Sequence, residues 1–126
     1  MTEPFKIYDD FFDLRPDDST GIIRFYENNI LLLDNKSVFK DKDEFSNYVL
    51  ILSQYTISLE NLGKYTKAIN YAEKTLKLID LKASDYDINL NQFTLYWSVL
   101  TTKGRAYYHL KDYSKSIIVF NSTLRR

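Results

Sequence analysis

Few residues of this chain are of a type and spacing that could carry out catalysis. The sequence has no cysteine and one histidine, His109, which excludes thiol catalysis, disulfides and metal sites built from several histidines. Arg105 precedes His109 by four residues, but no carboxylate, serine or lysine joins them in a recognisable catalytic motif. A histidine near a helix end most often just favours the helix dipole. We therefore expect no catalytic residue, no metal and no cofactor, and keep a small enzyme using His109 and Arg105 only as an alternative.

Two acidic pairs, Asp9-Asp10 and Asp17-Asp18, are the other candidates for cation binding. Both lack the alternating spacing and central glycine of a calcium loop. Helix capping explains the second pair, and we interpret the first as a solvated acidic segment.

The charge balance bears on the class of partner. Among 126 residues, 17 are Lys or Arg and 17 are Asp or Glu, so the net charge is zero and no overall field favours nucleic acid or an anionic membrane. Basic and aromatic residues alternate over residues 103–111, which suits single-stranded nucleic acid, but no RNA-binding motif accompanies them. The longest aliphatic runs, 30–33 and 49–52, are far too short to span a bilayer, and no secretory signal is recognisable. We expect a soluble, cytoplasmic globular domain without a nucleic-acid or membrane partner.

Apolar spacing predicts two helices joined by a tight turn in the middle of the chain. From residue 43 to 62, apolar side chains recur at steps of three and four, as on one face of a helix. Asp41 and Glu44 resemble a capping box at its start, and Gly63 can take the left-handed conformation that ends a helix. A second helix is expected over residues 65–79. The single-glycine joint predicts an antiparallel pair.

The same pair recurs toward the C-terminus. Ser84, with Asp87 three residues later, is expected to cap a helix that carries apolar residues at helical steps up to Leu110. A last helix is expected from Tyr113 to Leu124. The segment LGKYTKAI at 62–69 matches LKDYSKSI at 110–117 with an offset of 48, which is an internal repeat.

A weaker third copy lies near the N-terminus. Matches to residues 66–80 at an offset of 46 predict one degenerate helix over residues 18–35, capped by Asp18 or Ser19. Residues 1–17 form an N-terminal arm, and its apolar part is expected to be an extended segment or a single helical turn packed on the helices.

The run Leu59, Leu62-Gly63, Tyr65, Ala68-Ile69 and Leu76 resembles the helix-turn-helix of the tetratricopeptide repeat family. The second copy presents Gly104, Tyr107, Leu110, Tyr113, Ile117 and Leu124 at matching positions. The resemblance implies an all-α fold in which antiparallel hairpins stack as a short right-handed superhelix, with repeats over 43–80 and 84–126 in a single domain of residues 1–126. Departures include Lys111 in place of Gly63, Ser116 in place of Ala68, the lack of the usual final proline, and spacings longer than the family's common 34.

The resemblance further implies a noncatalytic scaffold that holds a peptide or partner helix on a concave wall, lined by the first helix of each hairpin. Carried over by position, the lining residues are Leu50, Ser53, Gln54, Ile57, Glu60 and Asn61, then Ser98, Thr101, Thr102, Arg105, Tyr108 and His109. Ile57 and Tyr108 would be apolar anchors and Arg105 an anion contact, although an ion pair is the commoner role of such an arginine. Members that grip chaperone tails carry Lys and Asn where this chain has Ser53, Ile57, Thr101 and Thr102, which disfavours that specialisation.

The last helix suggests an alternative. Its apolar residues 117–120 would lack a covering helix, so either the array continues past Arg126 or this face pairs with a second copy. The alternative function is a self-association module that buries Ile118 and Phe120 in a homodimer.

Overall fold

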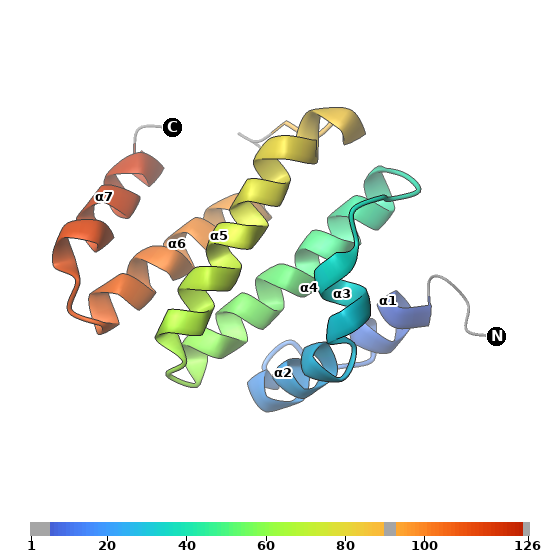
Figure 1. The fold of residues 1–126 in the computed structure, drawn as a ribbon, viewed down its shortest axis with the longest axis horizontal. Helices are drawn as coiled ribbons and strands as arrows, with labels where there is room; N and C mark the ends of the chain where they lie inside the picture. Colours follow the sequence, from blue (N-terminus) through green and yellow to red (C-terminus); the bar gives the residue numbers. More distant parts are fainter. Residues whose placement is uncertain (1–5, 90–92, 125–126) are drawn as a thin grey trace.

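The computed structural model describes residues 6–89 and 93–124, and every regular element within these ranges is a helix (Figure 1). The expected all-α class is confirmed. In chain order the elements are α1 (Lys6–Phe12), α2 (Ser19–Asn28), α3 (Ile30–Asn35), α4 (Lys42–Asn61), α5 (Tyr65–Lys82), the short 3-10 helix η1 (Ala83–Tyr86), α6 (Thr94–His109) and α7 (Tyr113–Leu124).

Helix α4 is central, because it packs against α1, α2, α5 and α6. Its start confirms the predicted capping box: the Asp41 carboxylate accepts the backbone N–H of Glu44 at 2.9 Å. The Glu44 carboxylate accepts the N–H of Lys40 at 2.6 Å, one residue earlier than the reciprocal bond of a standard box. Neighbours on several sides bury α4 over most of its length.

The two hairpin turns have the same backbone geometry at an offset of 48. Helices α4 and α5 run antiparallel through a turn in which Gly63 has φ +78°, as predicted (Figure 1). The N–H of Lys64 bonds to Leu59 O and that of Gly63 to Glu60 O, the pair of bonds that defines a Schellman motif. Between α6 and α7, Asp112 bonds to Tyr107 O and Lys111 to Tyr108 O, with Lys111 at φ +63°.

Two of the expected helix boundaries are wrong. Ser84 does not cap the helix of the second hairpin; it lies in η1, which Asp87 closes in left-handed conformation, and α6 begins only at Thr94. The expected single helix over 18–35 is interrupted at Asn29 and forms α2 and α3, because the Asn29 side chain bonds back to Phe25 O. Its predicted cap is correct, since the Asp18 carboxylate accepts the N–H of Gly21.

The N-terminal arm is more ordered than expected. Residues 6–12 form the seven-residue helix α1, whose buried Tyr8 and Phe11 pack into the core beside α4. An extended segment or a single turn is therefore not what forms here. The paired apolar residues gain more from burial against α4 than the short acidic helix costs to form.

Three carboxylates tie α1–α3 and the segment after them to α4 and α5. Asp34 accepts hydrogen bonds from Tyr26, Tyr71 and Lys74, and Glu27 accepts them from Tyr55 and Lys67. Glu44 accepts a hydrogen bond from the hydroxyl of Tyr8 at 2.7 Å and pairs with Lys36 at 3.0 Å.

Beside these carboxylates the rings of Tyr26 and Tyr55 stack with centroids 4.0 Å apart, and Tyr71 meets both edge-on. Tyrosine therefore joins the N-terminal helices to the hairpins through both its ring and its hydroxyl.

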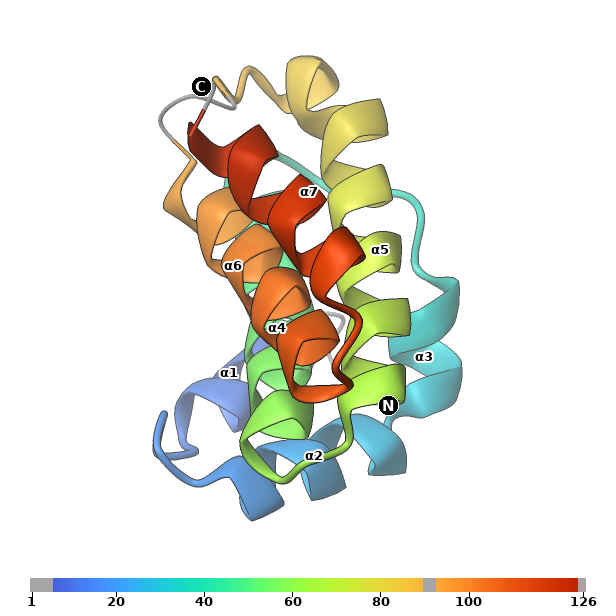
Figure 2. The same cartoon turned by 90° about the vertical axis from the view of Figure 1, so that its left-hand side faces the viewer.

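The helices define two sides of the molecule. In Figure 2, α6, α4 and α1 lie along one side, and α5 and α3 along the other. The first side holds the helices that the sequence places on the inner wall.

Candidate binding surface

A stripe of partly exposed side chains runs along α4 on the side shared with α6 and α1. Leu50, Gln54 and Ile57 are spaced by four and three residues, so they lie on one face of the helix. None of the three is charged, and each remains half-buried although most of α4 is buried. The stripe is therefore an uncharged part of α4 that stays accessible between the ends of the helix.

A groove of about 400 Å³ lies between this stripe and α6. Its lining residues from α4 and α6 are Ile57, Thr94, Trp97, Ser98, Thr101, Thr102 and Arg105. The structure thus brings together five residues that the sequence nominated from two distant segments: Ile57, Ser98, Thr101, Thr102 and Arg105. Trp97, the single tryptophan of the chain, is also in the lining.

Two of the three threonines that line the groove use their hydroxyl protons within α6. Thr101 Oγ1 donates to Trp97 O and Thr102 Oγ1 to Ser98 O, each at 2.8 Å. Thr102 is buried and its oxygen accepts a bond from Arg105 Nη2, whereas the half-buried Thr101 keeps acceptor capacity and toward a ligand accepts a hydrogen bond more readily than it donates one.

Arg105 is held by Glu60 of α4. Its Nε lies 3.0 Å from Glu60 Oε2 and its Nη2 2.9 Å from Oε1, a two-point contact with a buried carboxylate. Hydrogen bonding to Glu60 raises the pKa of the Arg105 guanidinium further above its ordinary value. The positive charge expected to bind an anionic partner is therefore already neutralised, as the commoner role of such an arginine implies.

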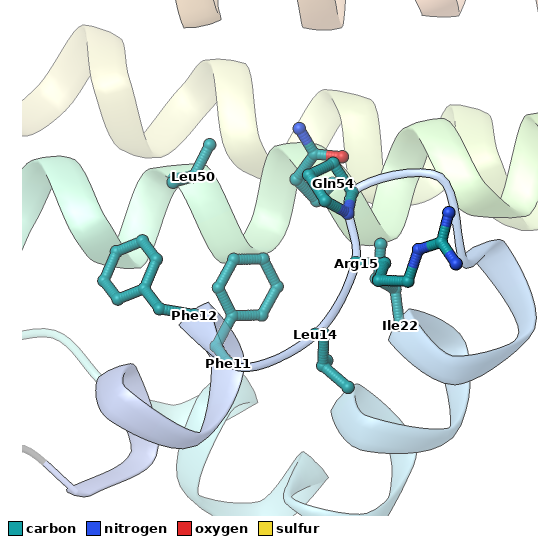
Figure 3. A pocket seen from close by; sticks show the side chains of 8 residues that line it. Phe11, Phe12, Leu14, Arg15, Ile22, Leu50 and Gln54 are labelled. Atoms are coloured by element: carbon teal, nitrogen blue, oxygen red, sulfur yellow. The ribbon is translucent and has the colours of Figure 1, made fainter.

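A second hollow, of about 250 Å³, opens at the N-terminal part of the same stripe (Figure 3). Phe11 and Phe12 of α1 point toward α4, whose Leu50 and Gln54 line the same hollow. Leu14, Arg15 and Pro16 of the following loop and Ile22 of α2 complete the lining. In Figure 3 the Arg15 guanidinium points away from the two rings, and it pairs with Asp17 at 3.3 Å on the exposed loop.

Position in the repeat did not identify this second hollow. It arises because α1 folds back on α4, so Phe11, Phe12 and Leu14 join the stripe from far away in the sequence. The one feature of the sequence that could have indicated this hollow is the cluster of apolar residues between 5 and 14. Such a cluster predicts packing but does not identify the helix against which it packs.

The other nominated residues lie elsewhere. Ser53 is fully buried, and its hydroxyl donates to Val49 O at 2.7 Å, so it is corrected to a packing residue. Thr102 is buried as well and only borders the groove. Asn61 is exposed but donates to Ser19 Oγ of α2.

Tyr108 and His109 form part of an aromatic cluster at the end of α6. The His109 ring stacks on Tyr65 of α5 with centroids 4.7 Å apart, and Tyr108 packs edge-on against Tyr113 of α7. Both residues lie beyond the lining of the groove, so they are not brought together with Ile57.

The structure separates the two residues nominated for self-association. Ile118 is exposed on the outer face of α7, with Ile117 beside it. Phe120 instead packs against Gly104 inside the hairpin, so closely that a Cβ built at Gly104 would lie 2.8 Å from Phe120 Cζ. The expectation that Phe120 forms an intermolecular contact is corrected, because its ring is engaged in its own chain.

The basic residues considered for nucleic acid are partly paired. Lys103 lies 3.7 Å from Glu73, and Arg105 is bound to Glu60. Within residues 6–89 and 93–124, no group of three or more His, Asp or Glu side chains could hold a metal ion. None of the helices in these ranges combines the length and the apolarity that crossing a bilayer would require.

Comparison of the chain with protein-family models, with curated proteins and with solved structures finds no significant match. The resemblance to the tetratricopeptide repeat family therefore rests on the residues quoted above.

Proposed function

We propose that this protein is a noncatalytic interaction module that binds a segment of a partner protein along the wall formed by α4 and α6. The observation that carries the proposal is the continuous half-buried stripe Leu50, Gln54 and Ile57, with a hollow at each end. Helix-in-groove and extended-peptide recognition both use apolar anchors of this kind beside unpaired acceptors.

We further propose that the two hairpins stack as in the tetratricopeptide repeat family, as part of a right-handed superhelix. The Schellman bonds that recur at an offset of 48 support a true structural repeat rather than a chance match of residues. In such a stack the first helix of each hairpin, α4 and α6, lines the binding wall.

Selection from a random displayed peptide library tests the binding site. Peptides are selected for binding to the wild-type protein and against binding to the Ser98→Arg variant. Ser98 is exposed in the groove, so a charged side chain there does not disturb the core. We expect affinity for the selected peptides to fall at least about tenfold, or about 1.4 kcal/mol, in Ser98→Arg. Trp97 supplies a second readout, since its emission should change when a peptide enters the groove.

A matched control carries a charged substitution outside this surface. Leu31→Asp alters an exposed apolar position of α3, on the other side of the molecule, and should bind as the wild type does. Equal binding by the wild type and by Ser98→Arg would place the peptides elsewhere and contradict the proposal.

A second candidate function is self-association through α7. Its outer face exposes Tyr113, Ile117 and Ile118 at about half or more of their surface. An isologous contact needs a self-complementary patch, and the one charged residue of this helix, Lys115, pairs with Asp112. Two copies could therefore meet here without repulsion between like charges.

A further inference from the structure

We propose that the wall of α4 and α6 selects an uncharged segment that presents apolar side chains, and that Arg105 does not recognise an acidic partner. This inference rests on the proposed function and specifies the chemical class of the partner.

Both helices of the wall contribute long stretches without charge. Residues 45–59, which include the stripe of α4, contain no Asp, Glu, Lys, Arg or His, and the same is true of residues 88–102, which lead into and form most of α6. The groove takes Ile57 from the first run and Thr94, Trp97, Ser98, Thr101 and Thr102 from the second, and Arg105 is its one charged lining residue. A charged group placed against the wall would lose hydration without gaining a counter-charge.

Arg105, the one cation that lines the groove, would bind an anionic partner only at an energetic cost. An incoming carboxylate that sought the same two-point contact would have to displace Glu60, and one that approached another N–H of the guanidinium would lie beside the Glu60 carboxylate, which repels it. Displacing Glu60 would leave a buried carboxylate unpaired, which is strongly unfavourable. A basic partner has no free carboxylate to reach in the groove either, because Glu60 is the anion that Arg105 already binds.

The remaining polar groups suit a neutral partner. Thr101 offers its hydroxyl oxygen as an acceptor, and the Gln54 amide offers both a donor and an acceptor at the other hollow. These groups match the backbone N–H and C=O of a peptide, while Trp97, Ile57 and Phe12 match its apolar side chains.

The spacing of the hollows sets the spacing of the anchors. Leu50 borders one hollow and Ile57 the other, seven residues apart, which is about 10 Å along a helix. Two side chains at that distance are about three residues apart in an extended segment or about seven apart in a helix. Volumes of about 250 and 400 Å³ each accommodate a large aliphatic or aromatic side chain.

The chemistry of the peptides selected on the full chain tests this inference. We expect enriched peptides to be depleted in Asp, Glu, Lys and Arg relative to the input library and to carry two large apolar residues at one of the two spacings. Their affinity should change less than about twofold between low and high sodium chloride, because no charge pair crosses the interface.

The outcomes separate the two proposals. Acidic peptides whose binding weakens about tenfold or more in high salt would overturn the inference about chemistry while leaving the groove as the binding site. Basic peptides with the same salt dependence would overturn it equally. A library that yields no peptide preferring the wild type over Ser98→Arg would overturn the proposed function, and this inference with it.

Discussion

At the residue scale, the two hairpin turns differ in the residue type that adopts the left-handed backbone conformation. Gly63 and Lys111 occupy equivalent positions with φ +78° and +63°, yet only the first is a glycine. A side chain in this conformation places Cβ close to the following carbonyl, which a glycine avoids. The second turn therefore forms at an energetic cost that the first does not bear.

Two opposite substitutions test this difference. Gly63→Ala should lower the free energy of unfolding by about 1 kcal/mol, because no atom lies within 4 Å of the new Cβ and only the backbone conformation is penalised. Lys111→Gly should raise the free energy of unfolding by about 0.5 kcal/mol or more. Urea denaturation measures both, and two variants that match the wild type would contradict the strain argument.

Gly104 shows a steric requirement at the same scale. The Phe120 ring of α7 packs against Gly104 of α6. Beside this contact, Ser116 Oγ donates a hydrogen bond to Gly104 O at 2.9 Å. A methyl group there would overlap the ring.

Gly104→Ala should therefore destabilise the chain by about 1–2 kcal/mol, although alanine is the better helix former. Phe120→Leu in the same chain should recover part of the loss by making room for the methyl group. Thermal unfolding of the two single variants and the double variant gives the coupling energy. Strictly additive effects would show that the two residues do not meet.

At the element scale, docking of α3 onto α5 depends on a carboxylate. Burial alone would raise the pKa of Asp34, but hydrogen bonds from Tyr26, Lys74 and Tyr71 outweigh it and lower that pKa below its ordinary value. The same balance lowers the pKa of Glu44, where bonds from the Lys40 backbone, Tyr8 and Lys36 overcome desolvation. Both carboxylates stabilise the fold when they are ionised.

Stability should therefore fall in acid. A carboxyl group with a lowered pKa in the folded state contributes fully above the pKa of the unfolded chain, near 4, and loses its contribution as pH falls through the folded value. Asp34→Asn should cost about 1–2 kcal/mol at pH 7 and progressively less below pH 4. Chemical denaturation across this range, with Asp80→Asn on the exposed face of α5 as control, measures the difference. A cost that stays constant with pH would contradict the ionic role of Asp34.

At the scale of the whole molecule, charge and apolar surface are distributed unevenly. The groove between α4 and α6 has one charged lining residue, Arg105, which pairs with Glu60, and the outer face of α7 exposes Ile117 and Ile118. These are separate surfaces, since the groove residues belong to α4 and to the α6 positions that face it.

The two surfaces can be distinguished by mass and by binding. If α7 mediates self-association, sedimentation equilibrium should detect a dimer at high concentration that Ile118→Asp weakens by about tenfold. Ile118→Asp should leave peptide capture by the groove unchanged, whereas Ser98→Arg should do the reverse. A strict monomer at high concentration would remove the second candidate function.

The hairpin elements were predictable from local signals. Apolar steps of three and four, the Asp41-Glu44 cap and Gly63 sufficed for α4 and α5, because these features act within one or two turns of a helix. The start of α6 was misplaced, since Ser84 and Asp87 carry the same residue types that cap a helix but form η1 and its left-handed closure. Local chemistry permits both structures, and packing of α5 against α6 selects one.

Side-chain roles on the wall depended more strongly on distant contacts. The family resemblance nominated Ile57, Thr101 and Arg105, which line one groove, and also Ser53, which is buried. Phe120 likewise comes after exposed apolar residues of α7, but its ring packs against Gly104. Periodicity assigns a face of a helix, whereas the depth of each residue on that face depends on the neighbouring helices.

The sequence by itself determined the all-α class, the repeat at an offset of 48 and the turn between α4 and α5, because each follows from backbone preference and apolar spacing over a few residues. Only the tertiary structure decided that α1 completes a second hollow, that Glu60 neutralises Arg105 and that Ile57 of α4 lines one groove with uncharged residues of α6. These features join residues about 30 to 45 positions apart, and burial of apolar surface, which has no direction along the chain, brings such residues together.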